Sequence, residues 1–135
     1  MSSISKTKQI LLVDDDEAGN MLTRIMLEEE MKAPFELLTF TSAKEALGFL
    51  ESVPSDLPDL ILLDINMPGM SGFDFLEACH AQGLIPGEGP RVVLITSSLS
   101  PRMQEQAAAY PSVWAVEEKP MTLEAMSAFL GRYMA

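Results

Sequence analysis

Acidic side chains directly follow two of the apolar runs in this sequence. Asp14 and Asp15 come after the run at residues 9–13, and Asp64 closes the run that begins at residue 60. Carboxylates held within about 4–6 Å of one another repel, and they raise at least one pKa unless a cation neutralises them. Because these segments offer oxygen ligands and contain no His or Cys, they suit Mg²⁺ or Mn²⁺ better than Zn²⁺. If the fold brings the three acids together, the sequence predicts a site for a divalent cation.

A hydroxyl and a lysine follow two further apolar runs. Thr96 ends the run at 91–96, and Lys119 lies just beyond the run at 113–116. A metal ion, a hydroxyl and a lysine beside a carboxylate are the groups that phosphoryl transfer to that carboxylate needs. Lys119 and the metal would neutralise phosphoryl oxygens, Thr96 would donate a hydrogen bond to one of them, and Asp64 would attack in line. The product would be an aspartyl phosphate.

Each of these residues also has an ordinary explanation. Asp64 precedes the turn at residues 67–69, and Asp is common in turns. The acids at 14–17 suit a helix N-terminus, although capping accounts for only part of that cluster. A lone lysine before Pro120 is usually a solvated loop residue, and a cis bond before that proline is a further hypothesis. The combination of these residues, rather than any one of them, indicates a site.

The elements that must hold this site are strands alternating with helices. The apolar runs lack polar alternation, so they indicate strands buried on both faces, as in a parallel sheet covered by helices. Strands are predicted at 9–13, 35–40, 60–64, 91–96 and 113–116, and helices from 18 to before Pro34, at 43–52, at 72–82, at 101–110 and from 122 onward. With right-handed crossovers, this order predicts an α/β doubly wound fold whose strands end at one edge.

Local signals support these elements. Three predicted helices begin with a capping serine, namely Ser42, Ser71 and Ser100. Trp114 lies on the last predicted strand and is expected to pack in the core. Cys79 is expected to be buried and unreactive, and His80 to lie on the surface without a role.

The composition fits one domain. A chain of 135 residues with 47% hydrophobic content can bury a core of its own. A formal charge of −11 argues against binding to nucleic acid or to an anionic membrane surface. No apolar run approaches the roughly 20 residues that span a bilayer, and the first residues do not form a secretory signal, so we expect a cytoplasmic protein. We expect a single domain over residues 1–135, with 1–7 frayed and with no output domain.

Four segments together resemble the receiver domain of two-component response regulators. They are ILLVDDDE at 10–17, LILLDINMPGMSG at 60–72, VVLITSS at 92–98 and EKPM at 118–121. The resemblance covers nearly the whole chain and implies a flavodoxin-like five-stranded sheet in the order 2-1-3-4-5. It also implies that Asp64 takes a phosphoryl group from a phosphohistidine on a histidine kinase or a histidine phosphotransfer protein. Output would pass to a downstream protein target by protein–protein interaction.

The same resemblance assigns the metal ligands and the residues that tune hydrolysis. Asp15 and Asp64 would bind Mg²⁺ directly, together with the main-chain carbonyl of Asn66. Asp14 would hold the metal through water. Asn66 and Ser98 occupy the variable positions that tune attack by water on the acyl phosphate. Because neither side chain is a strong general base at neutral pH, we expect slow self-hydrolysis and a long-lived signal.

The switch implied by the resemblance couples the phosphate to the face formed by the fourth helix, the fifth strand and the last helix. Thr96 and Lys119 would contact the phosphoryl oxygens, and Thr96 would move toward them. An aromatic residue three positions before the lysine would then turn inward, but Val116 stands there. Ser97 also replaces the smaller alanine that is common after the threonine. The aromatic half of the switch is therefore missing from this sequence.

Two other functions are alternatives to that of a receiver. A phosphatase resembling the haloacid dehalogenase group would also form an aspartyl phosphate with Mg²⁺, but its nucleophile is followed two residues later by a second acid, where this chain has Asn66. A pseudo-receiver would bind partners without being phosphorylated. As a receiver, the chain is not expected to be an enzyme beyond catalysing its own phosphorylation and dephosphorylation.

Overall fold

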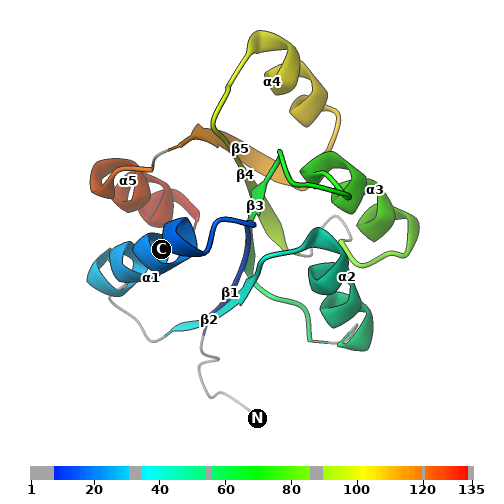
Figure 1. Ribbon diagram of the computed structural model, residues 1–135, viewed down its shortest axis with the longest axis horizontal. Coiled ribbons are helices and arrows are strands. Elements are labelled where there is room, and N and C mark those ends of the chain that lie inside the picture. The colour runs from blue at the N-terminus through cyan, green and yellow to red at the C-terminus, as the bar shows by residue number, and fades with distance from the viewer. Residues whose placement is uncertain (1–7, 31–34, 54–55, 86–89, 120, 134–135) are drawn as a thin grey trace.

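The computed structural model describes residues 8–30, 35–53, 56–85, 90–119 and 121–133 (Figure 1). The strands are β1 (Lys8–Val13), β2 (Phe35–Phe40), β3 (Leu60–Asp64), β4 (Arg91–Thr96) and β5 (Val113–Glu118). The helices are α1 (Glu17–Glu30), α2 (Ala43–Ser52), α3 (Gly72–Ala81), α4 (Pro101–Ala108) and α5 (Leu123–Tyr133). Every predicted element is present, and only the boundaries shift slightly.

The strands form one parallel sheet in the order β2-β1-β3-β4-β5. Figure 1 shows α1 and α5 on one side of this sheet and α2, α3 and α4 on the other. Each side has its own core: Leu27 of α1 and Met126 of α5 pack on one face, and Leu50 of α2 and Phe75 of α3 pack on the opposite face. The predicted α/β fold and the strand order that the resemblance implied are both confirmed.

β3 lies at the centre of the sheet, between β1 and β4. All of its residues are buried. Leu60 and Leu62 contribute to the core beneath α1 and α5, whereas Ile61 and Leu63 contribute to the core beneath α2 and α3. The absence of polar alternation in this run is thus explained, because successive side chains point to opposite faces and both faces are covered by helices.

The predicted capping serines are confirmed. Ser42 Oγ accepts from the Glu45 N–H at 3.3 Å, Ser71 Oγ accepts from the Asp74 N–H at 3.1 Å, and Ser100 Oγ accepts from the Met103 N–H at 3.2 Å. Each bond satisfies a backbone N–H that the first turn of a helix leaves without a partner. At α3 the Asp74 carboxylate returns the interaction by accepting from the Ser71 N–H, which fixes the start of the helix that follows Asp64.

The prediction that Trp114 packs in the core is wrong. Val92 pairs with Val113 and Val93 pairs with Ala115, so Trp114 is the extra residue of a β-bulge on the edge strand β5. The bulge turns the indole outward, where it is 46% exposed and lies beneath the Arg91 guanidinium at 4.4 Å from the ring centroid. A bulge depends on how β5 pairs with β4, and a strand pattern in the sequence does not contain that information.

The apolar residues of α1 do not all face the core. Leu27 is buried, but Met21, Leu22 and Ile25 are 65%, 56% and 49% exposed. The inner face of the helix carries Asn20 as its other buried residue. A helix therefore lies where the sequence predicts one, while the side that it buries is set by how α1 packs on β1 and α5.

The remaining expectations have mixed outcomes. Cys79 is buried, as predicted, and burial raises the pKa of its thiol to about 12. His80 is exposed, as predicted, although its ring contacts Ser112 and Tyr110. Among the described residues, no helix is both long and apolar enough to cross a membrane. The predictions for residues 1–7, for Pro34 and for Pro120 lie outside the described part of the chain.

Candidate functional site

Three carboxylates meet where β1 and β3 end. The strands are adjacent and parallel, and Val13 pairs with Leu63. Asp14 and Asp64 each come directly after one residue of this pair, so they lie side by side at the ends of the two strands. Carboxylate oxygens of Asp14, Asp15 and Asp64 lie within 4.8 Å of one another. Asp14 and Asp64 are buried, whereas Asp15 is exposed. The structure therefore brings together the three acids that the sequence singled out.

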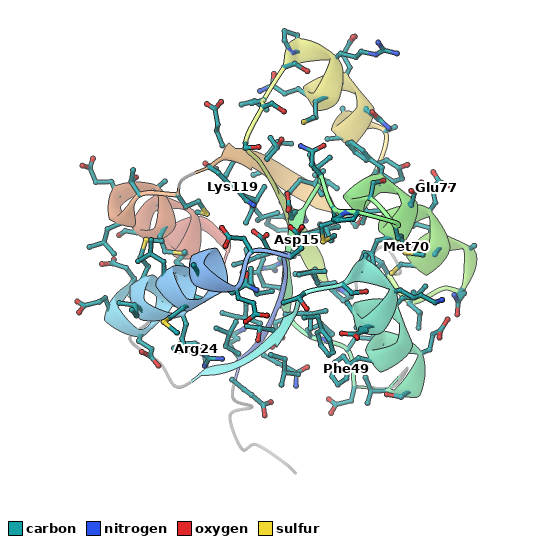
Figure 2. All side chains as sticks on the ribbon, in the orientation of Figure 1. Asp15, Arg24, Phe49, Met70, Glu77 and Lys119 are labelled. Atoms are coloured by element: carbon teal, nitrogen blue, oxygen red, sulfur yellow. The ribbon has the colours of Figure 1, made fainter. Side chains whose placement is uncertain are left out.

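Lys119 reaches the same place from the end of β5. Its Nζ lies 2.7 Å from Asp14 Oδ2 and 3.4 Å from Asp64 Oδ2. Its backbone N–H donates to the Thr96 carbonyl at 2.7 Å, which ties the end of β5 to the end of β4. In Figure 2 the labelled Asp15 and Lys119 both lie toward the centre of the molecule, whereas Arg24 and Glu77 lie at its periphery. One ammonium thus sits between two of the three carboxylates.

The charges in this site are not balanced. Burial raises the pKa of Asp64 to about 6, and the Asp14 carboxylate adds to this rise, while Lys119 opposes it. Burial lowers the pKa of Lys119, but its bonds to Asp14 and Asp64 outweigh that effect and leave the pKa above its ordinary value. Lys119 therefore stays charged near neutral pH, yet one ammonium does not neutralise three carboxylates.

Glycines allow the turn between β3 and α3 to pass close to Asp64. Gly69 has φ of +82°, a conformation that an L side chain rarely adopts. A Cβ at Gly72 would lie 2.7 Å from the Asp64 carbonyl oxygen and 2.9 Å from Ile65 Cα. The Gly72 N–H instead donates to the Ile65 carbonyl at 2.9 Å. The backbone that carries Asp64 is thus fixed by direct contact with the first residue of α3.

Thr96 lies at the end of β4 and is fully buried. Its Oγ1 accepts from Asn66 Nδ2 at 3.2 Å and from the Ser98 N–H at 3.1 Å. A hydroxyl oxygen has two lone pairs and one hydrogen, so these two donors leave the hydroxyl hydrogen free to donate. The Asn66 N–H also donates to Asp64 Oδ1 at 3.2 Å. Asn66 therefore links the acidic group to the threonine.

Val116, a residue of the predicted switch, and Ser97, which follows Thr96, lie near the site or its supporting core. Val116 is half-buried and packs against the core beneath α2, α3 and α4. Ser97 is exposed and lines a cavity beside Lys119. The structure locates both residues, and the role of Val116 in switching stays a prediction.

Asn20 is a residue of the site that the sequence did not single out. Its Nδ2 donates to the Asp14 carbonyl at 2.9 Å from the first turns of α1. The Asp16 N–H donates to Asp14 Oδ1 at 3.0 Å, so Asp14 is held at both its main chain and its side chain. The only signal in the sequence was a polar residue within an apolar helix pattern, which is too common to identify a function.

The donor set fits a hard divalent cation. All three acids offer oxygen, their carboxylates converge, and burial of Asp64 makes additional positive charge favourable. Mg²⁺ and Mn²⁺ prefer such carboxylate oxygens, whereas Zn²⁺ favours nitrogen and sulfur ligands. Asp14, Asp15 and Asp64 are thus the residues that could hold a metal ion.

The chain resembles longer curated proteins over this domain. It is 34% identical over 93 residues to the protein-glutamate methylesterase/protein-glutamine glutaminase of group 3 operon from Rhodopseudomonas palustris. This match covers 69% of the present chain and 23% of that protein. It is 32% identical over 114 residues to protein-glutamate methylesterase/protein-glutamine glutaminase 3 from Leptospira interrogans. This second match covers 83% of the present chain and 30% of that protein. The chain spans less than a third of the length of these relatives.

Solved structures share the whole fold. A two-component response regulator from Cytophaga hutchinsonii superposes with a TM-score of 0.82 at 29% identity, over 96% of this chain and 98% of that one. A CheY-like receiver domain protein from Methanospirillum hungatei superposes with a TM-score of 0.77 at 28% identity, over 94% and 93% of the two chains. The family described as response regulator receiver domain matches residues 10–131. The chain therefore belongs to the response regulator receiver domain family.

Proposed function

We propose that this chain is a phosphoacceptor of a two-component or phosphorelay system, in which Asp64 receives a phosphoryl group in a Mg²⁺-dependent reaction. The donor is a phosphohistidine on a histidine kinase or a histidine phosphotransfer protein. The observation that carries this proposal is the placement of Lys119 Nζ beside Asp14 and Asp64, within a cluster of three carboxylates. Output then passes to a downstream protein by protein–protein interaction.

The transfer exchanges one bond to phosphorus for another. An Asp64 carboxylate oxygen attacks the phosphorus, the P–N bond to the donor imidazole breaks, and the imidazole nitrogen keeps the electron pair of that bond. Asp64 attacks as the carboxylate, and its pKa of about 6 leaves it mostly ionised at neutral pH. The product is a mixed anhydride between the Asp64 carboxyl group and phosphate.

The surrounding residues supply charge and orientation. Lys119 already lies 3.4 Å from Asp64, so its ammonium can follow the phosphoryl oxygens as negative charge moves onto the aspartate. The Thr96 hydroxyl, whose lone pairs are occupied by Asn66 and Ser98, has its hydrogen free to donate to a phosphoryl oxygen. A bound Mg²⁺, held by the three aspartates, would supply the remaining positive charge that lets a phosphate approach this acidic site.

The acyl phosphate is expected to hydrolyse slowly. Attack by water is accelerated by a base that removes its proton. The Asn66 side chain and the Ser98 backbone N–H both bond to Thr96, and the side chains of the two residues, an amide and a hydroxyl, are weak bases at neutral pH. The proposal therefore includes a long-lived phosphorylated state.

The proposal is tested with acetyl phosphate and Mg²⁺, followed by intact-mass measurement. Wild type should gain one phosphoryl group, and Asp64→Asn should gain none. Asp59→Asn is the matched control, because Asp59 precedes the same strand at its opposite end and is exposed. Asp15→Ala removes a metal ligand, so added Mg²⁺ should no longer increase the labelling of this variant. Lys119→Ala should still be labelled, but its phosphorylation should no longer act on the downstream protein. Labelling of Asp64→Asn at the wild-type level would contradict the proposal.

The same experiment separates the alternatives. Membership of the receiver domain family favours the phosphoacceptor function over the haloacid dehalogenase alternative, and sustained release of phosphate from phosphomonoesters would be needed to revive that alternative. A pseudo-receiver would show no gain of mass in wild type under any of these conditions.

A further inference from the structure

A cavity of about 470 Å³ opens beside the acidic site, between α1 and the residues that follow β4 and β5. This volume lies within the range of natural small-molecule sites, roughly 300–1,000 Å³. Its apolar wall includes Leu22 and Met26 of α1, Ile95 of β4 and Met121, which follows Lys119 by two residues. The wall offers hydrophobic contact and room for a ligand, in contrast to the charged cluster next to it.

One end of this cavity belongs to the acceptor site. Asp14 and Lys119 line the cavity and also form the ion pair described above. A phosphoryl group bound by Lys119 would therefore lie next to this cavity. The rest of the donor molecule would meet the apolar wall on one side and water on the other, because Ala18 and Leu22 at the cavity are exposed.

We propose that this cavity binds the acyl part of a small acyl phosphate and makes the chain selective for donors with an apolar acyl group. The inference rests on the proposed phosphoacceptor function and adds a substrate class to it. A chain of four carbons buries more apolar surface against Leu22, Met26 and Met121 than an acetyl group does. A charged or strongly polar acyl group would lose hydration against Leu22, Met26 and Met121, which offer it no hydrogen bond.

The reaction with such a donor is balanced without another reactant. An Asp64 carboxylate oxygen attacks the phosphorus, and the bond between phosphorus and the acyl oxygen breaks. The leaving oxygen keeps the electron pair, so the donor departs as a carboxylate anion. The open side of the cavity gives this carboxylate a route to solvent.

The first test compares butanoyl phosphate with acetyl phosphate at equal, subsaturating concentrations in the presence of Mg²⁺. The two donors carry the same reactive anhydride and differ by two methylene groups. Burial of those groups should make the initial labelling rate of wild type roughly tenfold higher with butanoyl phosphate. Equal rates would overturn the inference and leave the proposed function intact. No labelling with either donor would overturn both.

The second test uses two neighbouring positions on α1. Leu22 and Met21 are similarly exposed, at 56% and 65%, but only Leu22 lines the cavity. Leu22→Ala should lower the ratio of the butanoyl phosphate rate to the acetyl phosphate rate roughly threefold. Met21→Ala should alter neither rate. An equal effect of both substitutions would show that the cavity is not where the acyl group binds.

A binding measurement provides a readout that does not depend on transfer. Butanoylphosphonate has a P–C bond in place of the labile P–O bond and cannot donate its phosphoryl group. In a spectrum of methionine methyl groups, it should shift the signals of Met26 and Met121 and leave Met103, which packs against the opposite face of the sheet, unmoved. Shifts confined to other methionines, or no shifts at all, would contradict the proposed site.

Discussion

Two clusters of polar side chains in this molecule differ in whether their charges and hydrogen-bonding groups are paired within the cluster. Where α3 meets the turn before β5, the Tyr110 hydroxyl donates to Glu77 Oε2 at 2.7 Å, and His80 Nε2 lies 3.3 Å from Ser112 Oγ. Each polar group there has a partner, and the ring of Tyr110 stacks on those of Phe73 and His80. That cluster holds two elements together and needs no further ligand.

The cluster at the carboxyl ends of the strands is different. Three carboxylates share one ammonium, and the pKa of Asp64 rises to about 6. The groups are held in this arrangement by rigid neighbours, namely β3, the Gly72 contact and Asn20. The comparison indicates that a polar cluster with surplus charge, held by a rigid frame, marks a functional site, whereas a self-sufficient cluster serves the fold.

The largest effect should come from breaking the frame of the acidic cluster. Gly72→Ala places a methyl group against the backbone at Asp64 and Ile65 and should lower the free energy of unfolding by about 3 kcal/mol. Gly48→Ala is the control, because a Cβ there meets nothing and the helix gains a better helix former. Urea unfolding of both variants tests this. Similar stabilities would show that the turn before α3 is not rigid.

Removing the surplus charge should stabilise the metal-free protein. In the folded chain the pKa of Asp64 is about 6, against 3.8 for an ordinary aspartate. The folded state therefore binds this proton more tightly than the unfolded chain, so stability falls as the pH rises from about 4 through 6, and the loss is complete above that range.

Asp64→Asn should abolish this loss and raise the metal-free stability at pH 7.5 by on the order of 2 kcal/mol. Mg²⁺ should stabilise wild type under the same conditions and should stabilise the variant less. Thermal unfolding from pH 4 to pH 8, with and without EDTA, measures both effects. An identical pH dependence in wild type and Asp64→Asn would contradict the surplus charge.

A smaller effect is expected from the support behind Asp14. Asn20→Ala removes the hydrogen bond to the Asp14 carbonyl and should cost about 1 kcal/mol, with weaker Mg²⁺ binding as the distinguishing result. Thr23→Ala on the same helix serves as the control, since Thr23 is half-buried and has no described bond to an acid of the site. Calorimetric titration with Mg²⁺ checks this, and equal affinities in both variants would rule out a positioning role.

The smallest effect belongs to the self-sufficient cluster. Tyr110→Phe removes the hydrogen bond to Glu77 and keeps the stacked ring, so the loss should be about 0.5 kcal/mol, with no change in labelling by acetyl phosphate. The hydrogen bond to Glu77 raises the pKa of Tyr110 to about 12. The hydroxyl therefore stays protonated up to pH 9, and the difference in stability between wild type and Tyr110→Phe should be the same up to that pH. A large loss of labelling would mean that this cluster also serves the site.

The fold could be predicted almost completely from the sequence, because its signals are local. Apolar runs such as the one before Asp64 fix strands that are buried on both faces, and capping serines such as Ser71 fix helix starts. Trp114 was placed wrongly, since a bulge arises from the pairing of β5 with β4. The exposure of Met21 and Leu22 depends in the same way on helix packing.

The site was predictable in its members and less so in its contacts. The acids, Thr96 and Lys119 lie at or just beyond the ends of strands that must end at one edge of the sheet, so their meeting is a consequence of topology. The closer approach of Lys119 to Asp14 than to Asp64 depends on tertiary geometry. The link from Asn66 to Thr96 also joins the turn after β3 to the end of β4, and no spacing in the sequence predicts it.

The most direct measurement is to locate the phosphoryl group chemically. Borohydride reduces an aspartyl phosphate to homoserine, which tandem mass spectrometry assigns to one residue. After incubation with acetyl phosphate and Mg²⁺, we predict homoserine at position 64 alone, and none when EDTA is present. Homoserine at another acid, or an unmodified Asp64 under conditions that support transfer, would contradict the central claim.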